Sequence, residues 1–400
     1  MLCLIILLAN QGKAIGHRRL AGISLLLSPK GACISEVLMA RSRPNQRLVR
    51  AFGLTNTFVS PSTSIHRSFV ASARTLLNEA SSRGWEHFGD LASRAVHVEL
   101  ACPRSTGGFG AKIDYSIFVQ CVTLRVILVG LLQGDGSVED LARDDILTSA
   151  NHINLLWQLS KSPNPIPSHL LPQLNASLRR MLPNLEAFPN PVDIVIPAWE
   201  TFWRVVATAI AYSHVDPALR RLFSELYFSP TERVFKGFEQ GNGSICVKNV
   251  IDEAMRLHPP SKHISRISRL RFPFKILPPS IIHLVDSAFP GAVYVQEHAN
   301  IQATLLSPEI WGPDCEQFNP RRFALHDRPD QQEALSYIFG GGRTRCIGAS
   351  WAPIAIGIVS SAILEELDTM KAKIEPGTSI GGRNGWAGWC IVSAENLILT

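Results

Sequence analysis

The sequence predicts a mainly α-helical protein with a minor β component, for three reasons. Apolar residues make up 46% of the 400 residues and charged residues 18%, which allows a large buried core and argues against a disordered chain. Beyond residue 110, most of the chain carries apolar residues at helical spacing. Strand-like stretches are short and come late, and Ala292–Gln296 is the clearest of them.

The domain organisation is expected to be simple. Neither an internal repeat nor a low-complexity linker divides the chain, so residues 1–400 are predicted to form one domain. The first 110 residues show weak periodicity and are poorly readable. The informative motifs lie within residues 191–389.

Apolar residues at helical spacing predict the helices in chain order. They are Val138–Leu159, Leu174–Leu182, Asp193–His214, Pro217–Tyr227, Val247–His258 and Ile347–Leu367. The Pro-rich segment Ser162–Ser168 cannot be helical, and Pro259-Pro260 should end the fifth helix. The apolar run Ile117–Leu132 contains Gln120 and Arg125, which favours a buried core helix over a membrane span. The opening run Met1–Ala9 is too short to span a bilayer and lacks a preceding basic stretch.

Charge and cysteine usage exclude several classes of protein. The net charge is +6, but the basic residues are scattered and form no arm of the kind that binds nucleic acid. A mildly basic surface suits an acidic protein partner, and an ordinary solvated surface explains it equally well. The eight cysteines show no CxxC pair and no regular spacing, which argues against a zinc ribbon or a disulfide framework. A reducing, intracellular compartment is therefore expected.

The most informative segment is Tyr337-Ile-Phe-Gly-Gly-Gly-Arg-Thr-Arg-Cys-Ile-Gly348. Three consecutive glycines allow a sharp turn and the close approach of a flat ligand. Cys346 is expected just before the predicted helix Ile347–Leu367, whose N-terminus would favour a thiolate, and Arg343 and Arg345 would act in the same direction. An anionic sulfur beside a flat space is what a haem iron needs as its axial ligand.

This loop resembles the haem-binding signature of the cytochrome P-450 family, in which Phe339, Gly342, Cys346 and Gly348 stand at the family's spacing. The resemblance implies haem b (iron protoporphyrin IX) with Cys346 as the metal ligand, and a P-450-like fold. The alternative is a Gly-rich turn before a helix with a structural cysteine. The segment is not a P-loop, and it lacks the GxGxxG spacing of a dinucleotide site.

Two further motifs occur in the family's order upstream of the cysteine. Glu253 and Arg256 lie at i and i+3 of a predicted helix and can pair. The segment Phe318–Phe323 is similar to the family's Pro-x-Arg-Phe segment, which places Arg322 with that pair. A surface ion pair is the alternative for Glu253 and Arg256. The resemblance implies a structural role for all three. It also places Arg266 on a haem propionate, with Arg269 as a rival.

An acid and an alcohol stand together in an otherwise apolar helix, in Ile196-Pro-Ala-Trp-Glu-Thr-Phe-Trp203. Pro197 leaves the carbonyl of Asp193 without its helical partner and should kink the helix. Glu200 and Thr201 resemble the family's acid-alcohol pair, which implies a catalytic role in delivering protons to bound oxygen. A partly exposed Glu beside a core Thr is the alternative.

The chain also departs from the family's pattern. Thr344 stands two residues before the cysteine, where the family usually has a basic residue that binds a propionate, and Arg343 or Arg345 would have to compensate. The part ahead of the central helix is short and looks incomplete, because the anchor and the first sheet strands are not recognisable. No tryptophan marks the usual haem-contacting helix, for which Ile65–Arg74 is the best substitute.

The resemblance implies a haem-dependent monooxygenase that inserts one oxygen atom of O2 into a small apolar substrate. The sequence looks closest to fungal members, many of which oxidise secondary metabolites. An NADPH-dependent flavoprotein reductase is the expected partner, and nucleic acid is not. The expected location is the cytosolic face of the endoplasmic reticulum if an anchor exists and the cytoplasm otherwise, with peripheral membrane association left open. The alternatives are a haem-thiolate isomerase, dehydratase or peroxygenase, and a truncated, non-catalytic remnant.

Overall fold

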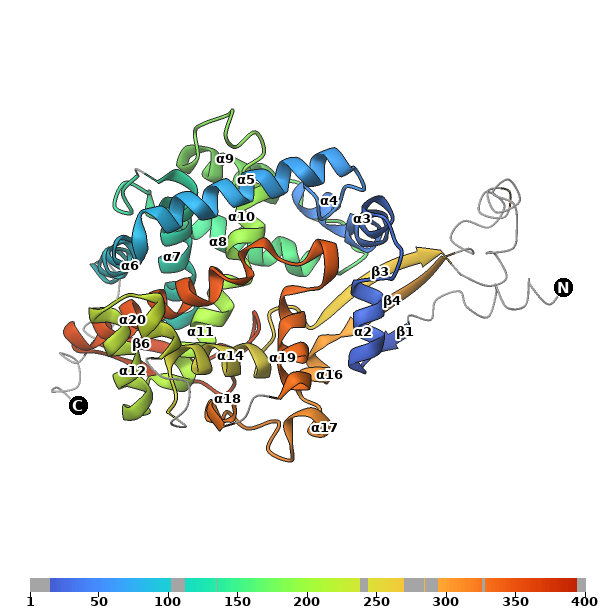
Figure 1. The fold of residues 1–400 in the computed structure, drawn as a ribbon. Coiled ribbons are helices and arrows are strands. Elements are labelled where there is room, and N and C mark those ends of the chain that lie inside the picture. Colours follow the sequence, from blue (N-terminus) through green and yellow to red (C-terminus); the bar gives the residue numbers. More distant parts are fainter. Residues whose placement is uncertain are drawn as a thin grey trace.

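The computed structural model describes residues 15–101, 112–134, 136–237, 244–269, 284, 294–325 and 328–393. Helices form the bulk of the described part, and the strands gather into two small sheets (Figure 1). The predicted class, mainly α with minor β, is confirmed.

The described helices follow one another along most of the chain. They are α2 (Leu20–Leu27), α3 (Ile34–Ser42), α4 (Gln46–Phe52), α5 (Thr63–Ser82), α6 (Gly84–Ala101), α7 (Tyr115–Ile127), α8 (Arg143–Leu159), α9 (Leu170–Met181), α10 (Val192–Trp199), α11 (Phe202–Ser213), α12 (Pro217–Phe228), α13 (Glu232–Lys236), α14 (Val247–Leu257), α16 (Ile301–Leu305), α17 (Pro308–Trp311), α18 (Arg322–Leu325), α19 (Pro329–Ser336) and α20 (Ala352–Thr369).

The strands join parts of the chain that lie far apart in sequence. They are β1 (Ile15–His17), β2 (Ile113–Asp114), β3 (His263–Arg269), β4 (Tyr294–Asn300), β5 (Ala372–Glu375) and β6 (Cys390–Ser393). In the first sheet β4 lies between β1, which is parallel to it, and β3, which is antiparallel. In the second sheet β6 lies between β2 and β5. The expectation that no sheet strand could be recognised near the N-terminus is corrected by β1.

The core forms around α20, which packs against α6, α11, α12 and α14. Helix α20 also approaches α13 closely at Gly357. A Cβ at this position would lie 2.9 Å from ring atoms of Phe235, so only glycine fits there without a shift. Two helical stretches among the described residues, Tyr115–Gln133 and Val192–Ser213, are long and apolar enough to cross a membrane by length and composition alone. They are 89% and 72% buried within the protein, as core helices are. This agrees with the core helix predicted for Ile117–Leu132.

Most predicted helices form with shifted bounds. The helix expected over Val138–Leu159 begins five residues later, as α8, and the one expected over Leu174–Leu182 begins earlier, as α9. Ser162–Ser168 is not helical, as predicted. The strand expected at Ala292–Gln296 is β4, of which residues 292 and 293 lie outside the described part. The poorly readable first 110 residues contain α2 to α6.

Two helices differ from their predictions in ways that matter for the site. The helix expected over Asp193–His214 is divided into α10 and α11, and the break falls at Glu200 and Thr201 rather than at Pro197. The carbonyl of Asp193, which Pro197 leaves free, accepts a hydrogen bond of 2.7 Å from Nδ2 of Asn56. The last long helix, α20, begins at Ala352 and not at Ile347.

Candidate functional site

The loop between α19 and α20 carries Cys346 on a tightly folded backbone. The backbone N–H of Cys346 donates to the carbonyl of Phe339 over 2.8 Å, which closes the loop at its base. Gly340 and Gly342 both have positive φ, which favours glycine. A Cβ at Gly342 would lie 2.8 Å from Oγ of Ser28 and 3.0 Å from the carbonyl oxygen of Leu27.

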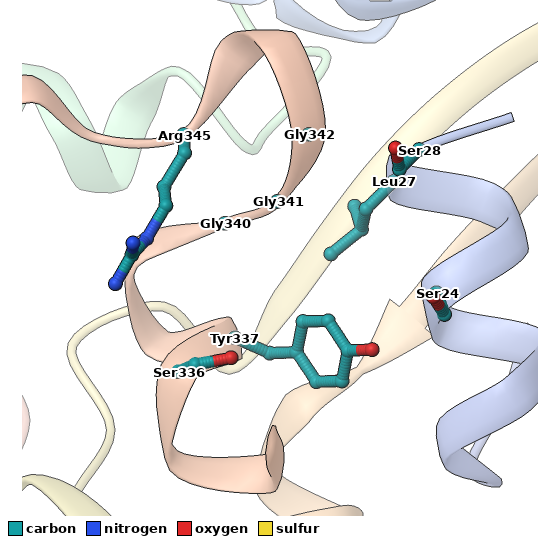
Figure 2. A pocket seen from close by; sticks show the side chains of 9 residues that line it. All are labelled: Ser24, Leu27, Ser28, Ser336, Tyr337, Gly340, Gly341, Gly342 and Arg345. Carbon is teal, nitrogen blue, oxygen red and sulfur yellow. The ribbon is translucent and has the colours of Figure 1, made fainter. Parts of the chain in front are cut away.

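The glycines therefore allow the loop to pack against α2, a neighbour that the sequence did not predict. A cavity of about 220 Å³ lies on this side of the loop. Figure 2 shows that Leu27 points toward the glycines and that the ring of Tyr337 reaches toward Ser24. Arg345 also lines this cavity, and Cys346 does not. The roles expected for Phe339, Gly342 and Gly348 in binding a cofactor stay predictions.

The environment of the Cys346 sulfur differs from the expected one. The residue as a whole is exposed, but the protein around its sulfur raises the pKa of the thiol by burial, while the backbone N–H of Gly348 and the charge of Arg345 lower that pKa by less. Because α20 begins six residues further on, its dipole is not at the sulfur. A backbone N–H and the charge of Arg345 thus lower the thiol pKa as expected, but burial outweighs them and the net shift is upward. A metal ion that binds this sulfur would itself deprotonate it.

Glu253, Arg256 and Arg322 are brought together in a buried network. Nε of Arg256 lies 2.7 Å from Oε2 of Glu253, and Nε of Arg322 lies 3.0 Å from Oε1. The backbone N–H of Asn319 adds a third donor to the same carboxylate, at 2.8 Å. Arg256 also donates to the carbonyls of residues 305, 315 and 317. The network therefore fastens α14 to the segment that leads toward the cysteine loop.

Glu200 lies at the break between α10 and α11 and is held by two arginines. Its side chain is almost fully buried and lies 2.9 Å from a terminal nitrogen of Arg204, and it also contacts Arg383. Burial lowers the pKa of both guanidinium groups, to about 10 for Arg204 and about 9 for Arg383. Thr201 is half-buried beside it. The catalytic roles expected for Glu200 and Thr201 stay predictions.

Arg266 lies on β3 with its side chain turned toward the cysteine loop. It is 6% exposed, and its terminal nitrogens donate to Oγ1 of Thr344 over 3.3 Å and to the carbonyl of Ser265 over 2.9 Å. Its Nε has no hydrogen-bond partner in the described part of the chain. Burial lowers the pKa of its guanidinium to about 10. The side chain of Arg269, its rival, lies outside what the structure describes.

A second buried arginine, Arg41 on α3, lies close to Arg266. It is also 6% exposed, and one of its terminal nitrogens donates to the carbonyl of Thr57 over 2.6 Å. Oγ1 of Thr57 in turn bonds Nδ1 of His66, on the helix that contains Ile65–Arg74. Arg41 was not predicted from the sequence, because it stands in the poorly readable N-terminal part and is 305 residues from the cysteine.

These contacts show that the residues present fit a haem. Buried cations are rarely left without an acidic partner, and the described hydrogen bonds and charge effects of Arg41 and Arg266 include none. Haem carries two carboxylates, which buried guanidinium groups with free N–H donors suit well. Arg343 and Arg345, which were expected to compensate for Thr344, are exposed.

Comparisons with known proteins agree with this geometry. The cytochrome P-450 family model matches residues 246–378, which include Glu253, Arg256, Arg322 and Cys346. Cytochrome P-450 714B3 of Zea mays is 30% identical over 121 residues, which cover 29% of this chain and 19% of the relative. Cytochrome P-450 714A2 of Arabidopsis thaliana is 31% identical over 121 residues, which cover 30% of this chain and 21% of the relative. The matches thus span about a fifth of the length of these relatives.

The likeness in fold extends further than the likeness in sequence. The solved structure of CYP175A1 from Thermus thermophillus superposes with a TM-score of 0.61 at 15% identity, and the match covers 94% of this chain and 88% of that one. At this identity the likeness shows the fold alone, and it shows it for nearly the whole chain. Motifs, fold and the matched segment agree: residues 246–378 match the cytochrome P-450 family model, and nearly the whole chain shares the fold of CYP175A1.

Proposed function

We propose that this chain is a haem-thiolate monooxygenase, which inserts one oxygen atom of O2 into a small apolar organic molecule. Family and fold imply haem b with a thiolate ligand, and the observation that carries the proposal is the position of Cys346. This cysteine stands in a loop closed by the bond from its own N–H to Phe339. The haem supplies the activation of oxygen when it is bound, since a thiolate ligand favours O–O cleavage.

The chain's own residues hold the reacting groups in place. The Sγ atom of Cys346 would hold the haem iron, and the network around Glu253 fixes the segment that precedes the loop. Thr201 is the group that passes a proton toward oxygen from its hydroxyl. Glu200, which is held between Arg204 and Arg383, keeps this break in the helix charged and positions the hydroxyl beside it.

An apolar substrate is supported by the outer surface of α10. Ile194, Pro197 and Ala198 are half-buried while their neighbours on the helix are mostly buried, and the stripe that they form ends at Thr201. Residues at this spacing share one face of a helix. An apolar molecule against this stripe would lie next to the hydroxyl that handles protons. The type of substrate, including a fungal secondary metabolite, belongs to the proposal.

Partner and location are part of the same proposal. Electrons come from an NADPH-dependent flavoprotein reductase, which the exposed Arg343 and Arg345 would attract by charge. The protein works inside the cell, at the cytosolic face of the endoplasmic reticulum if it has an anchor or associates peripherally with that membrane. A reducing compartment is supported by the free thiols of Cys33, Cys246, Cys315, Cys346 and Cys390.

One observation favours a second candidate function. A carboxylate held by two guanidinium groups is a poor proton carrier, because each ion pair opposes protonation. Glu200 is such a group. A haem-thiolate peroxygenase or isomerase needs no proton relay to O2, so it would tolerate this arrangement.

Isotope labelling distinguishes the two candidates. The purified, haem-loaded chain is incubated with a reductase, NADPH, ¹⁸O2 and a panel of monoterpenes and alkylbenzenes. The proposal predicts a product that carries one ¹⁸O atom, none with Cys346→Ser, and more peroxide per NADPH with Thr201→Val. A product that forms only with added peroxide, or that contains no new oxygen, would support the second candidate instead.

A further inference from the structure

Two arginines beside the cysteine loop are buried with hydrogen-bonding capacity to spare. The Nε atoms of Arg41 and Arg266 are both buried and lack a partner in the described part of the chain. Desolvation is the main effect on both groups, and it lowers the pKa of Arg41 to about 9 and that of Arg266 to about 10. The charge of Arg266 lowers the pKa of Arg41 further. Two like charges that are buried side by side favour an anion between or beside them.

The placement of Arg41 joins it to the cysteine loop. Helix α3, which carries Arg41, contacts both β3, which carries Arg266, and the 3₁₀ turn Gly342–Thr344. Figure 1 shows α3 beside the paired strands β3 and β4, on the side where α5 lies. Helix α5 contacts the turn that follows Cys346, Ile347–Ala349. Arg41 therefore belongs to the wall around the loop that carries the metal ligand.

Position 344 lacks the base that the family usually places there. Thr344 offers a hydroxyl, which already accepts a hydrogen bond from Arg266. Its neighbours Arg343 and Arg345 are exposed, and Arg345 lines the cavity on the α2 side of the loop. Neither of them provides a buried cation next to Arg266.

We infer that Arg41 binds a carboxylate of the haem and supplies, from helix α3, the positive charge that position 344 lacks. The inference rests on the proposed haem cofactor. Thr57 positions the guanidinium by accepting from one of its terminal nitrogens, and this leaves Nε free to donate. His66 holds Thr57 from the other side. Arg41 is thus a cofactor-binding residue, and Thr57 and His66 are positioning residues.

A purely structural role for Arg41 leaves part of the geometry unexplained. Its bonds to Thr57 and its ring contact with Phe58, at 5.4 Å from the centroid, would hold a loop in place. A loop clamp gains nothing from a buried Nε without a partner or from a second buried arginine as neighbour. An anionic ligand satisfies both features at once.

Haem titration tests the inference without any measurement of turnover. The apoprotein is titrated with hemin and with hemin dimethyl ester, whose carboxylates are masked, and affinity is read from the Soret band. Arg41→Gln should weaken hemin binding about 10- to 100-fold, as expected for one lost charge-assisted hydrogen bond. For the dimethyl ester, Arg41→Gln and wild type should bind within about threefold of one another.

Two control variants separate specific from general effects. Arg47→Gln removes a half-buried arginine on α4 that packs over Trp157 instead, and Arg343→Gln removes an exposed loop arginine. Both should leave hemin affinity within about threefold of wild type. Arg41→Lys should recover part of the loss, and circular dichroism of each apoprotein checks that it folds.

Two outcomes would overturn the inference, and they differ in what else they affect. If wild type binds hemin through a thiolate but Arg41→Gln weakens hemin and its dimethyl ester equally, or weakens neither, Arg41 does not bind a carboxylate and the proposed function stands. If wild type takes up no hemin, the proposed function and the inference fail together.

Discussion

Buried charges in this protein are of two kinds. The carboxylate of Glu253 has partners for both of its oxygens, in Arg256, Arg322 and the N–H of Asn319. Arg41 and Arg266 have no acidic partner in the part of the chain that the structure describes. The first kind stabilises the fold as it stands, whereas the second kind is completed only by a ligand.

The closed network around Glu253 predicts a large loss of stability when its acid is removed. Glu253→Gln should lower the free energy of unfolding by about 3–5 kcal/mol, because buried Arg256 loses its counter-charge and Arg322 is left with its ion pair to the partly exposed Asp314. Urea unfolding of the apoprotein measures this. Asp90→Asn is the matched control, since Asp90 pairs with Arg94 at the surface. This substitution should lower the free energy of unfolding by less than about 1 kcal/mol. Equal effects of the two substitutions on the free energy of unfolding would show that the network does not fasten α14 to the segment that leads toward the cysteine loop.

His258 predicts a pH dependence of stability. Burial, with smaller contributions from the charges of Lys262 and Arg256, lowers the pKa of its imidazole to about 4, and its Nε2 bonds the hydroxyl of Tyr212 over 2.8 Å. The unfolded chain takes up this proton near pH 6.5, so the stability is present above that pH. It is lost as the pH falls toward 4, by at most about 1.4 kcal/mol per pH unit.

Urea unfolding at pH 7.5, 6.0 and 5.0 measures this loss. His258→Gln keeps a hydrogen-bonding partner for Tyr212 without the titration, and its stability should fall less steeply over the same range. An identical slope in the variant and in wild type would mean that other groups, such as His214 or His263, whose pKa is also lowered by burial, account for the effect.

At the scale of elements, the divided central helix depends on a residue far away in sequence. Pro197 leaves the carbonyl of Asp193 without a donor from its own helix. Asn56, in the loop between α4 and α5, donates a hydrogen bond to this carbonyl instead. Asn56→Ala should cost about 1–3 kcal/mol, the penalty for a buried polar group without a partner. In a Pro197→Ala background the loss should shrink, because the helix regains its own N–H donor.

A double-mutant cycle with Asn56→Ala and Pro197→Ala measures the coupling. The predicted coupling is at least about 0.5 kcal/mol, as for residues that share a partner. Additive effects would show that Asn56 stabilises the loop independently of the proline.

The elements also show how far the sequence predicts the structure. The helices with a strongly periodic apolar face, such as α12 and α14, form close to their predicted bounds. Helix α5 was expected only as the segment Ile65–Arg74, because among its 20 residues only Ala80 is buried and the signal for its full length is weak. The start of α20 was placed too early, because Ile347 and the turn after it are as apolar as the helix itself.

The candidate site divides in the same way. Cys346 and the pair Glu253 and Arg256 were predicted from the resemblance of short motifs to those of the family, because each motif lies within a dozen residues of chain. Arg41 could not be found, because its relation to Thr344 exists only after α3 has packed against β3 and the cysteine loop. Local patterns therefore predict the metal ligand, and tertiary packing decides which arginines lie around the loop that carries it.

At the scale of the whole molecule, helices from the first hundred residues lie against the cysteine loop, which comes late in the sequence. Helices α3 and α5, from the first hundred residues, contact the turns on either side of Cys346. A ligand bound there would tie both parts together and would not bind the unfolded chain. Hemin at 100 times its dissociation constant should therefore raise the free energy of unfolding by about 2.7 kcal/mol.

Unfolding in urea with and without hemin measures this stabilisation. The same hemin concentration should stabilise the Cys346→Ser variant less than wild type, because the variant binds hemin with lower affinity. No shift in the midpoint for wild type would mean that hemin does not occupy the folded protein.

The most direct test of the central claim is the absorption spectrum of the haem-loaded, reduced protein under carbon monoxide. The account predicts a strongly red-shifted Soret band in the wild type, as a thiolate ligand produces, and its loss in Cys346→Ser with haem still bound. A spectrum without that band in the wild type, or with the same band after Cys346→Ser, would contradict the assignment of this sulfur to the iron.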